Sequence, residues 1–293
     1  MATVPQCASL KINMSEATAS VNNTSASIAS EDWYAHDGRT DIWVGMRSVH
    51  VWSALGWHDI RQRYRRSLLG PFWFTLSTFI MIGVLGLLYS KLLNQDIRTY
   101  LPYLGVGLVL WQFLSTSLLE SANGLIGAGF LIKQIRMPLS IHICRIVWRN
   151  FSILLHSLPV VMLFSLALGH YPSVHFLLII PGLLLLLLTG VWMGIVLAIL
   201  CLRFRDVLPI VTNLLQVAFF FTPIMWSPDL LKDRAWIAHF NPLYHLIEIV
   251  RAPMLGLPIQ AESWWWAIGM VVLGFGLAQM LMKAARHKVA YWL

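Results

Sequence analysis

Side chains whose types and spacing could do chemistry are sparse in this sequence. It contains no glycine-rich loop ending in Lys-Ser or Lys-Thr, which would cradle nucleotide phosphates, and no His-Glu-x-x-His zinc motif. A nucleophile elbow and an Asp-x-Asp pair are also absent. His239 and His245 could ligate a metal, but their spacing is more typical of ordinary loop histidines. We therefore predict no catalytic residue, no metal site and no cofactor in this chain.

Two carboxylates lie within apolar surroundings. Glu120 falls near the end of a predicted helix and is interpreted as a capped interfacial carboxylate. Glu248 and Arg251 are separated by three residues, the spacing at which side chains meet on one helix face. Such a pair is either shielded by protein or a weak surface pair contributing at most about 1 kcal/mol. The sequence leaves both alternatives open.

The amino-acid composition indicates what kind of fold must hold these polar side chains. Hydrophobic residues make up 58% of the 293 residues and charged residues only 12%, about half the share in a soluble domain. The chain is therefore predicted to be a polytopic membrane protein. Its net charge of +8 indicates loops facing anionic lipid rather than a nucleic-acid partner. Residues 1–40 are polar and are predicted to be a disordered cytoplasmic tail before a membrane domain over residues 41–293.

A dense basic cluster precedes the first long apolar stretch. Arg61, Arg63, Arg65 and Arg66 lie just before Pro71, and the chain then carries no charge until Lys91. Arginines at the edge of a span stay on the cytoplasmic side, and proline suits a first helical turn. A nucleic-acid-binding patch is the alternative, but the adjoining apolar stretch favours a cytoplasmic basic belt.

The apolar periodicity predicts an all-α fold with six transmembrane helices. Thirteen lysines and arginines fall in the predicted inside segments and five outside, so both termini are expected in the cytoplasm. The stretch 41–58 is predicted to be an amphipathic interfacial helix, with Ile42, Met46, Val49 and Trp52 on one stripe. The predicted spans are residues 72–92, 101–121, 147–168, 174–200, 207–226 and 264–283.

Two segments depart from plain spans. Residues 124–149 form a long inside segment that opens with three glycines. Residues 227–263 lie outside, yet they are too apolar for an exposed loop and are punctuated by prolines. Apolar stretches that do not span are typical of re-entrant helices shielded by protein or a water-filled cavity.

Several motifs together resemble one family. They are Arg-Tyr-Arg-Arg-Ser-Leu-Leu-Gly-Pro-Phe-Trp (63–73), Leu-Ile-Lys-Gln-Ile-Arg-Met-Pro (131–138), Arg-Phe-Arg-Asp-Val (203–207), Phe-Phe-Thr-Pro-Ile-Met-Trp (220–226) and Asn-Pro-Leu-Tyr-His-Leu-Ile-Glu-Ile-Val-Arg-Ala-Pro (241–253). In this order they resemble the transmembrane subunit of type-2 ABC transporters that export lipid-linked polysaccharide, in the O-antigen and capsule class. The resemblance covers about residues 41–290.

The resemblance implies a set of partners. The subunit would form a homodimer in the bacterial inner membrane, paired with two copies of a separate ATPase that binds ATP and magnesium. The substrate would be a lipid-linked O-antigen-type polysaccharide, with capsule, teichoic acid or a drug as alternatives. A membrane-embedded glycosyl- or acyltransferase is the rival class, but this chain shows no acidic or histidine cluster at a membrane face. A passive channel is a third class, but it would not need the cytoplasmic segment that couples such a subunit to its ATPase.

The resemblance also assigns roles to two segments. The residues from 130 to 141 would form the cytoplasmic coupling segment, although a surface helix held by lipid headgroups has the same pattern. The re-entrant helices at about 229–256 would line the outer exit. The coupling residues are Phe130, Leu131, Ile132, Lys133, Gln134, Ile135, Arg136, Met137 and Pro138, and the periplasmic gate residues are Tyr244, His245, Glu248 and Arg251.

Aromatic side chains are the best candidates for contact with a glycan. The chain has 14 Trp, 14 Phe and 8 Tyr, many near span ends. An interfacial belt is the ordinary explanation, whereas a conduit lined by flat faces would let sugar rings slide. The predicted conduit residues are Trp73, Phe74, Phe219, Phe220, Phe221 and Trp226.

Overall fold

The computed structural model describes residues 38–65, 72–135, 137–169 and 174–293. These residues are helical with short connections, and no strand occurs among them, which confirms the all-α prediction. The predicted tail lies outside the described residues except for its last three positions, and so do Arg66 and Arg136.

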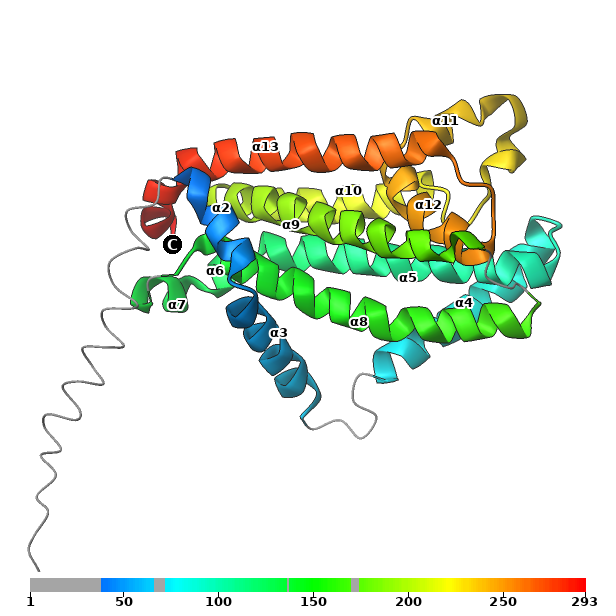
Figure 1. Cartoon of the computed structure of the whole chain (residues 1–293), viewed down its shortest axis with the longest axis horizontal. Coiled ribbons are helices and arrows are strands. Elements are labelled where there is room, and N and C mark those ends of the chain that lie inside the picture. The colour runs from blue at the N-terminus through cyan, green and yellow to red at the C-terminus, as the bar shows by residue number, and fades with distance from the viewer. Residues whose placement is uncertain (1–37, 66–71, 136, 170–173) are drawn as a thin grey trace, which may run out of the picture. The chain divides into compact units, whose positions relative to one another are not determined.

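The longest helices form a single bundle. In Figure 1, α5, α8, α9, α10 and α13 run side by side, and α4 is inclined to them. Short helices lie at the two ends of the bundle. The α-helices are α2 (Gly38–Arg47), α3 (Val49–Tyr64), α4 (Phe72–Leu92), α5 (Ile97–Ala122), α6 (Gly124–Gly127), α7 (Gly129–Gln134), α8 (Leu139–Ala167), α9 (Ile179–Arg203), α10 (Val207–Phe221), α11 (Trp236–His239), α12 (Pro242–Leu255) and α13 (Ala261–Trp292). Two 3₁₀ helices, η1 (Val174–Leu178) and η2 (Pro228–Arg234), complete the set.

Five segments are long and apolar enough to cross a membrane. They lie at Thr75–Leu92, Ile97–Ala122, Leu139–Ala167, His175–Arg203 and Ala261–Val289. The predicted fifth span, residues 207–226, contains α10, which has only 15 residues. At 1.5 Å per residue it is about 22 Å long, short of the roughly 30 Å of a bilayer's apolar core. The six-span layout is therefore only partly recovered.

Proline chemistry explains why α10 is short. Thr222 precedes Pro223 and adopts an extended backbone with ψ 136°, because a residue before proline avoids the helical region. A turn at 222–226 follows, and the chain continues into η2 instead of completing a span.

The helix α5 lies at the centre of the packing and contacts α4, α8, α9, α10 and α12. Two glycines permit this close approach. A Cβ atom on Gly105 would lie 3.3 Å from Val161 of α8, and one on Gly107 would lie 3.3 Å from Ile224 in the turn after α10. A side chain at either position would therefore require the neighbouring side chain to shift slightly.

The N-terminal stretch differs from the single interfacial helix that was predicted. It breaks at Ser48 into α2 and α3. Ile42 is buried and Val49 is exposed, so the predicted stripe does not face one side. Both helices pack on α8, and α2 also packs on α13.

The α2 helix is fixed to the beginning of α8 by Asp41. Its buried carboxylate accepts hydrogen bonds from the backbone N–H groups of Leu139 and Ser140, each at 3.2 Å. The Ser140 hydroxyl donates in return to the Asp41 carbonyl at 2.8 Å. Gly45 lies so close to Ser140 that an added Cβ would clash with its hydroxyl. Asp41 therefore supplies, from another helix, the cap that Pro138 cannot provide.

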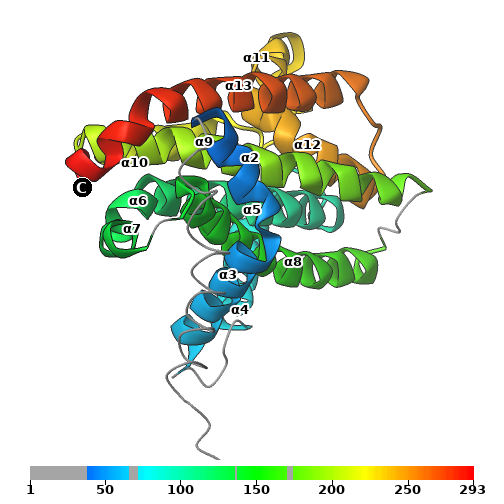
Figure 2. The same ribbon diagram turned by 60° about the vertical axis from the view of Figure 1, so that its left-hand side comes forward.

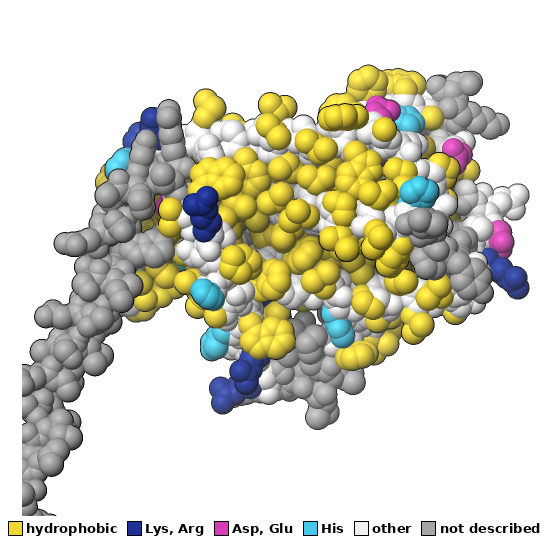
Figure 3. Space-filling view, viewed as in Figure 1, with side chains coloured by type: hydrophobic (Ala, Val, Ile, Leu, Met, Phe, Trp, Pro, Cys, Tyr) yellow, Lys and Arg dark blue, Asp and Glu magenta, His cyan; other side chains and the backbone are white. Residues whose placement is uncertain are grey.

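The two ends of the bundle differ in charge. One end carries α2, α6, α7 and the end of α13, and the other carries α11 and α12 (Figures 1 and 2). On the face in Figure 3 the middle is apolar, most lysine and arginine side chains lie toward the first end, and the acidic ones lie toward the second. An apolar belt between polar ends is the pattern of a membrane-embedded bundle.

Candidate functional site

A groove of about 410 Å³ lies between α4, α5 and α10. Its lining combines aromatic rings with hydroxyl and amide side chains at the depth of the spanning helices. Trp111 and Phe219 pack with their ring centroids 5.8 Å apart, and Phe220 lies edge-on to Phe219 at 5.2 Å. The polar lining residues are Thr78, Gln112, Ser115, Thr212 and Gln216.

The structure brings only some of the predicted conduit residues to this groove. Phe219 and Phe220 line it. Trp73 lies exposed in the first turn of α4, and Phe221 is exposed at the end of α10. Trp226 instead closes the turn after α10, donating from its indole to the Phe220 carbonyl at 3.1 Å. The side chain of Phe74 lies outside the described residues.

Sequence reasoning missed the polar part of the groove. The side chain of Gln112 donates to Thr116 at 2.8 Å, one turn further along α5. Polar side chains inside apolar helices tend to face a cavity or another helix. The sequence could have indicated the groove, because Gln112, Ser115 and Thr116 are polar residues within a largely apolar helix.

The predicted gate residues are buried together beside the turn at 222–226. Arg251 is 0% exposed. It donates to one oxygen of Glu248 from Nε at 3.0 Å and from Nη2 at 2.6 Å, and from Nη1 to the Pro223 carbonyl at 2.8 Å. Its guanidinium lies 3.8 Å from the centre of the Tyr103 ring. Of the two alternatives for this pair, the geometry is that of a shielded pair.

Two tyrosines of α5 hold the same turn. The Tyr100 hydroxyl donates to the Met225 carbonyl at 2.6 Å, and the Tyr103 hydroxyl lies 3.3 Å from the carbonyls of Pro223 and Trp226. Burial alone would lower the pKa of Arg251, which lies outside the five candidate spans, but the neighbouring Glu248 carboxylate reverses this and raises the pKa. Arg251 therefore stays charged and connects α12, α5 and the turn.

His245 connects α12 to α13. Its Nε2 lies 2.7 Å from the His239 carbonyl and its Nδ1 lies 2.8 Å from the Ser263 hydroxyl. A carbonyl only accepts, so Nε2 carries a proton, and in the neutral ring the Ser263 hydroxyl donates to Nδ1. The ring also stacks on Trp266 with an interplanar angle of 5°. No group of three His, Cys, Asp or Glu side chains within the described ranges could hold a metal ion.

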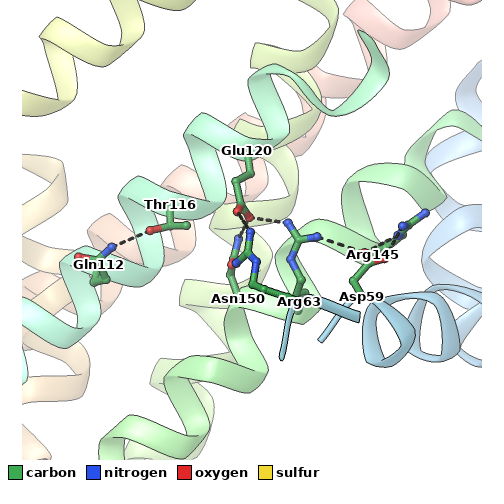
Figure 4. A network of polar contacts seen from close by, with 8 residues as sticks. Asp59, Arg63, Gln112, Thr116, Glu120, Arg145 and Asn150 are labelled. Carbon is green, nitrogen blue, oxygen red and sulfur yellow. Dashed lines mark hydrogen bonds and ion pairs between the residues drawn. The ribbon is translucent and has the colours of Figure 1, made fainter. Parts of the chain in front are cut away.

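A second polar cluster lies at the opposite end, where α3, α5 and α8 meet (Figure 4). Asp59 pairs with Arg145 through two hydrogen bonds and with Arg149 at 3.1 Å. Glu120 accepts from Arg63 at 2.7 Å, from Arg149 at 2.5 Å and from Asn150 at 2.7 Å. We call these six residues the charged network. The interpretation of Glu120 as a simple interfacial carboxylate understated its role.

The predicted basic belt divides in the structure. All three described arginines are exposed, but only Arg63 belongs to the charged network, whereas Arg61 on α3 and Arg65 just after its end do not. Together with Trp57 and His58, Arg61 and Arg65 border a surface hollow. An exposed tryptophan beside arginines suits a headgroup layer.

The predicted coupling residues form a short helix and an extended connection. Phe130 to Gln134 lie in α7, Ile135 is extended, and Met137 and Pro138 lead into α8. Phe130 is 76% exposed, and Ile135, Lys133 and Gln134 are exposed as well. Leu131 is half-buried, and Ile132 packs against the core. The segment therefore leaves Phe130 and Ile135 exposed and packs Ile132 against the core of the bundle.

These features define a multi-pass membrane protein with an apolar bundle, a groove within it and a short helix presented at one end. The sequence profile described as ABC-2 type transporter matches residues 50–255. The chain therefore belongs to the ABC-2 type transporter family, whose membrane subunits work with an ABC ATPase. The match runs from the second residue of α3 to the last residue of α12.

Curated relatives agree with this family. An O-antigen export system permease protein RfbA of Myxococcus xanthus is 28% identical over 197 residues, which cover 66% of this chain and 76% of that protein. An O-antigen export system permease protein RfbA of Klebsiella pneumoniae is 26% identical over 193 residues, covering 64% of this chain and 74% of that protein. A second Klebsiella pneumoniae protein of that name is 26% identical over 191 residues.

Proposed function

We propose that this chain is the membrane-spanning subunit of an ATP-driven exporter that moves lipid-linked O-antigen-type polysaccharide across the bacterial inner membrane. The observation that carries the proposal is the groove between α4, α5 and α10. Rings of Trp111, Phe219 and Phe220 stand beside the amides of Gln112 and Gln216 in one cavity. Sugars present flat apolar faces and rims of hydroxyl groups, so this mixture suits a glycan better than a purely apolar drug.

The names of the relatives support the same substrate class. Work would come from a separate ATPase, because the sequence carries no phosphate-binding loop of its own. We place α7 and the connection to α8 on the cytoplasmic side as the coupling segment. The basic end of the bundle and both termini would then face the cytoplasm, with α12 and the Arg251 cluster at the outer exit.

A second copy of the chain is part of the proposal. The helix α10 is too short to cross a bilayer, and it exposes Ile210, Leu214, Val217, Phe220 and Phe221. Backbone groups at its ends need protein shielding within the apolar layer. Packing of α10 against its counterpart in a homodimer would supply this shielding and close the groove on its open side.

Deletion of the gene in its own host tests the function. Surface polysaccharide should disappear and lipid-linked glycan should accumulate inside the inner membrane, and a plasmid copy should reverse both effects. Normal surface glycan in the deletion strain would refute the proposal.

The groove is tested separately with the double variant Gln112→Leu and Gln216→Leu. It keeps the side-chain volume but removes the hydrogen-bonding groups, so export should fall at least tenfold while membrane insertion stays normal. The control is Leu273→Ala, on an exposed part of α13 that does not line the groove. Equal export by the double variant and the control would place the glycan path elsewhere.

A further inference from the structure

The C-terminal end of α13 packs into the basic end of the bundle through two apolar side chains. Ala285 and Val289 are buried on one face of α13, and Trp292 continues that face at helical spacing. Trp292 and Leu293 are half-buried and pack against the core, whereas Tyr291 is 90% exposed. The Leu293 N–H donates to the Val289 carbonyl at 3.1 Å, so Leu293 continues the last turn of the helix. We call Trp292 and Leu293 the α13 link.

Leu293 lies against the beginning of α7. A Cβ atom added to Gly129, the first residue of α7, would lie 3.1 Å from Cδ2 of Leu293 and 3.9 Å from its Cγ. Figures 1 and 2 both show the end of α13 beside α6 and α7. The main packing neighbour of α7 among the described helices is α6, which precedes it in the chain. A displacement of α7 toward the bundle would therefore press on Leu293.

Trp292 contacts the end of α9. The Arg203 guanidinium lies 5.6 Å from the centre of a Trp292 ring and 4.9 Å from the centre of the Phe204 ring. Arginine is attracted to the faces of aromatic rings at such distances. Arg203 is the last residue of α9, and a tight turn in which the Val207 N–H donates to the Phe204 carbonyl at 3.1 Å leads into α10. The position of Trp292 therefore influences where α10 begins.

The helices α13 and α9 are packed tightly enough to move together. Their contact is the most extensive between any two described helices. Gly274 of α13 lies so close to Trp192 of α9 that an added Cβ would overlap the indole ring. Close-packed protein interiors transmit strain because they have low compressibility. A displacement at the end of α13 should therefore shift the end of α9 and the beginning of α10, which packs on α9 and lines the groove.

We infer that the α13 link positions α10 relative to α7, so that a displacement of α7 by the ATPase reaches the groove through Leu293, Trp292 and Arg203. The inference rests on the proposed function, in which α7 is the coupling segment. It deepens that proposal because the chain itself connects α7 only to α6 and α8, neither of which lines the groove. Energetic coupling between separated sites is carried by chains of packed side chains of this kind.

The test measures movement at the groove in the assembled transporter. The full chain, with its three cysteines replaced by alanine, is purified with its ATPase in nanodiscs. Thr212→Cys, in the part of α10 that lines the groove, is labelled with a maleimide reagent. The labelling rate is measured without nucleotide and with a nonhydrolysable ATP analogue. With the α13 link intact, the nucleotide should change this rate severalfold.

Trp292→Ala should abolish the nucleotide-dependent change in labelling and abolish export, while the ATPase still co-purifies. Trp292→Phe keeps an aromatic face for Arg203 and should restore most of both. The matched control is Tyr291→Ala, at the neighbouring exposed position, which should keep the full nucleotide response. Arg203→Gln removes the cation without opening a space in the core, and it should also reduce the response. It keeps the test decisive if Trp292→Ala fails to fold.

The outcomes separate this inference from the proposed function. A full nucleotide response in both Trp292→Ala and Arg203→Gln would overturn the inference alone, because the movement would then pass through α8. Loss of ATPase binding by a folded Trp292→Ala variant would also overturn it, since Trp292 would then belong to the docking contact. An unchanged labelling rate in the chain with an intact α13 link and bound ATPase would overturn both the inference and the proposed coupling.

Discussion

The Arg251 guanidinium contacts Glu248 and the Pro223 carbonyl at the same time, so one buried side chain holds α12 to the turn after α10. Its stacking on Tyr103 adds a third attachment, to α5. This relationship changes what an exchange of the two charges should do. A simple ion pair could be reversed, but a glutamate at 251 cannot donate to a carbonyl.

We therefore expect the double variant Glu248→Arg with Arg251→Glu not to rescue either single change. Arg251→Met should lower the free energy of unfolding by about 3–5 kcal/mol, the usual cost of removing one partner of a buried ion pair and leaving the other charge uncompensated. Thermal unfolding in detergent measures the loss, and Arg234→Met, at an exposed position, is the control. Full rescue by the exchange would show that the Pro223 contact contributes little.

The cap that Asp41 gives to α8 leads to a second prediction. Asp41→Ala leaves the N–H groups of Leu139 and Ser140 without their acceptor, and loss of such a cap costs about 0.5–2 kcal/mol. Asp41→Asn, which keeps one oxygen, should cost less. Unfolding midpoints rank the two variants. An alanine variant as stable as wild type would mean that other groups cap α8.

The parts of this structure that were predictable are those set by local sequence. Length and hydropathy identify a span without reference to its neighbours, and the i,i+3 spacing of Glu248 and Arg251 gives their pairing. The shortness of α10 could have been read from Thr222-Pro223, because proline constrains the residue before it. The sequence prediction nevertheless extended the span to residue 226, because apolar residues continue beyond Pro223.

The remaining features depend on residues far apart in the chain. Asp59 meets Arg145 across 86 positions, and Glu120 meets Arg63 across 57. No periodicity reports such a contact. Arg145 and Arg149 do fall one turn apart in an apolar helix, where charges require partners, so the sequence could have indicated the need for carboxylates but not their identity. The exposure of Phe130 and burial of Ile132 likewise follow from packing.

The orientation of the bundle gives a third prediction. The connections at 204–206 and 227–235 lie at opposite ends of the bundle in Figure 1. In a background with the native cysteines replaced by alanine, an impermeant thiol reagent added to intact cells should modify Asp229→Cys and spare Arg205→Cys. Both residues are exposed, so burial does not protect either one. Labelling of position 205 in intact cells would reverse the proposed orientation, whereas labelling only after membrane disruption would support it.

The last prediction concerns the contact with the ATPase. An apolar side chain that is 76% exposed at a polar end of the bundle, as Phe130 is, has no packing role in the subunit alone. Anchors of this type carry much of the binding energy at protein interfaces. Phe130→Asp should therefore abolish association with the ATPase and export, while the subunit still inserts and unfolds at its normal temperature. Ile132→Asp should instead destabilise the subunit, since Ile132 packs against the core.

A helix held on the membrane surface by lipid headgroups would respond differently. Its position would depend on cations, so Lys133→Ala would impair export more than Phe130→Asp would. Co-purification with the ATPase, measured alongside the unfolding midpoint of each variant, separates docking from folding. If Phe130→Asp retains the ATPase and exports normally, α7 is not the coupling element. Ile135, exposed on the connection to α8, would then be the next position to test, because it is the other apolar side chain that this segment presents.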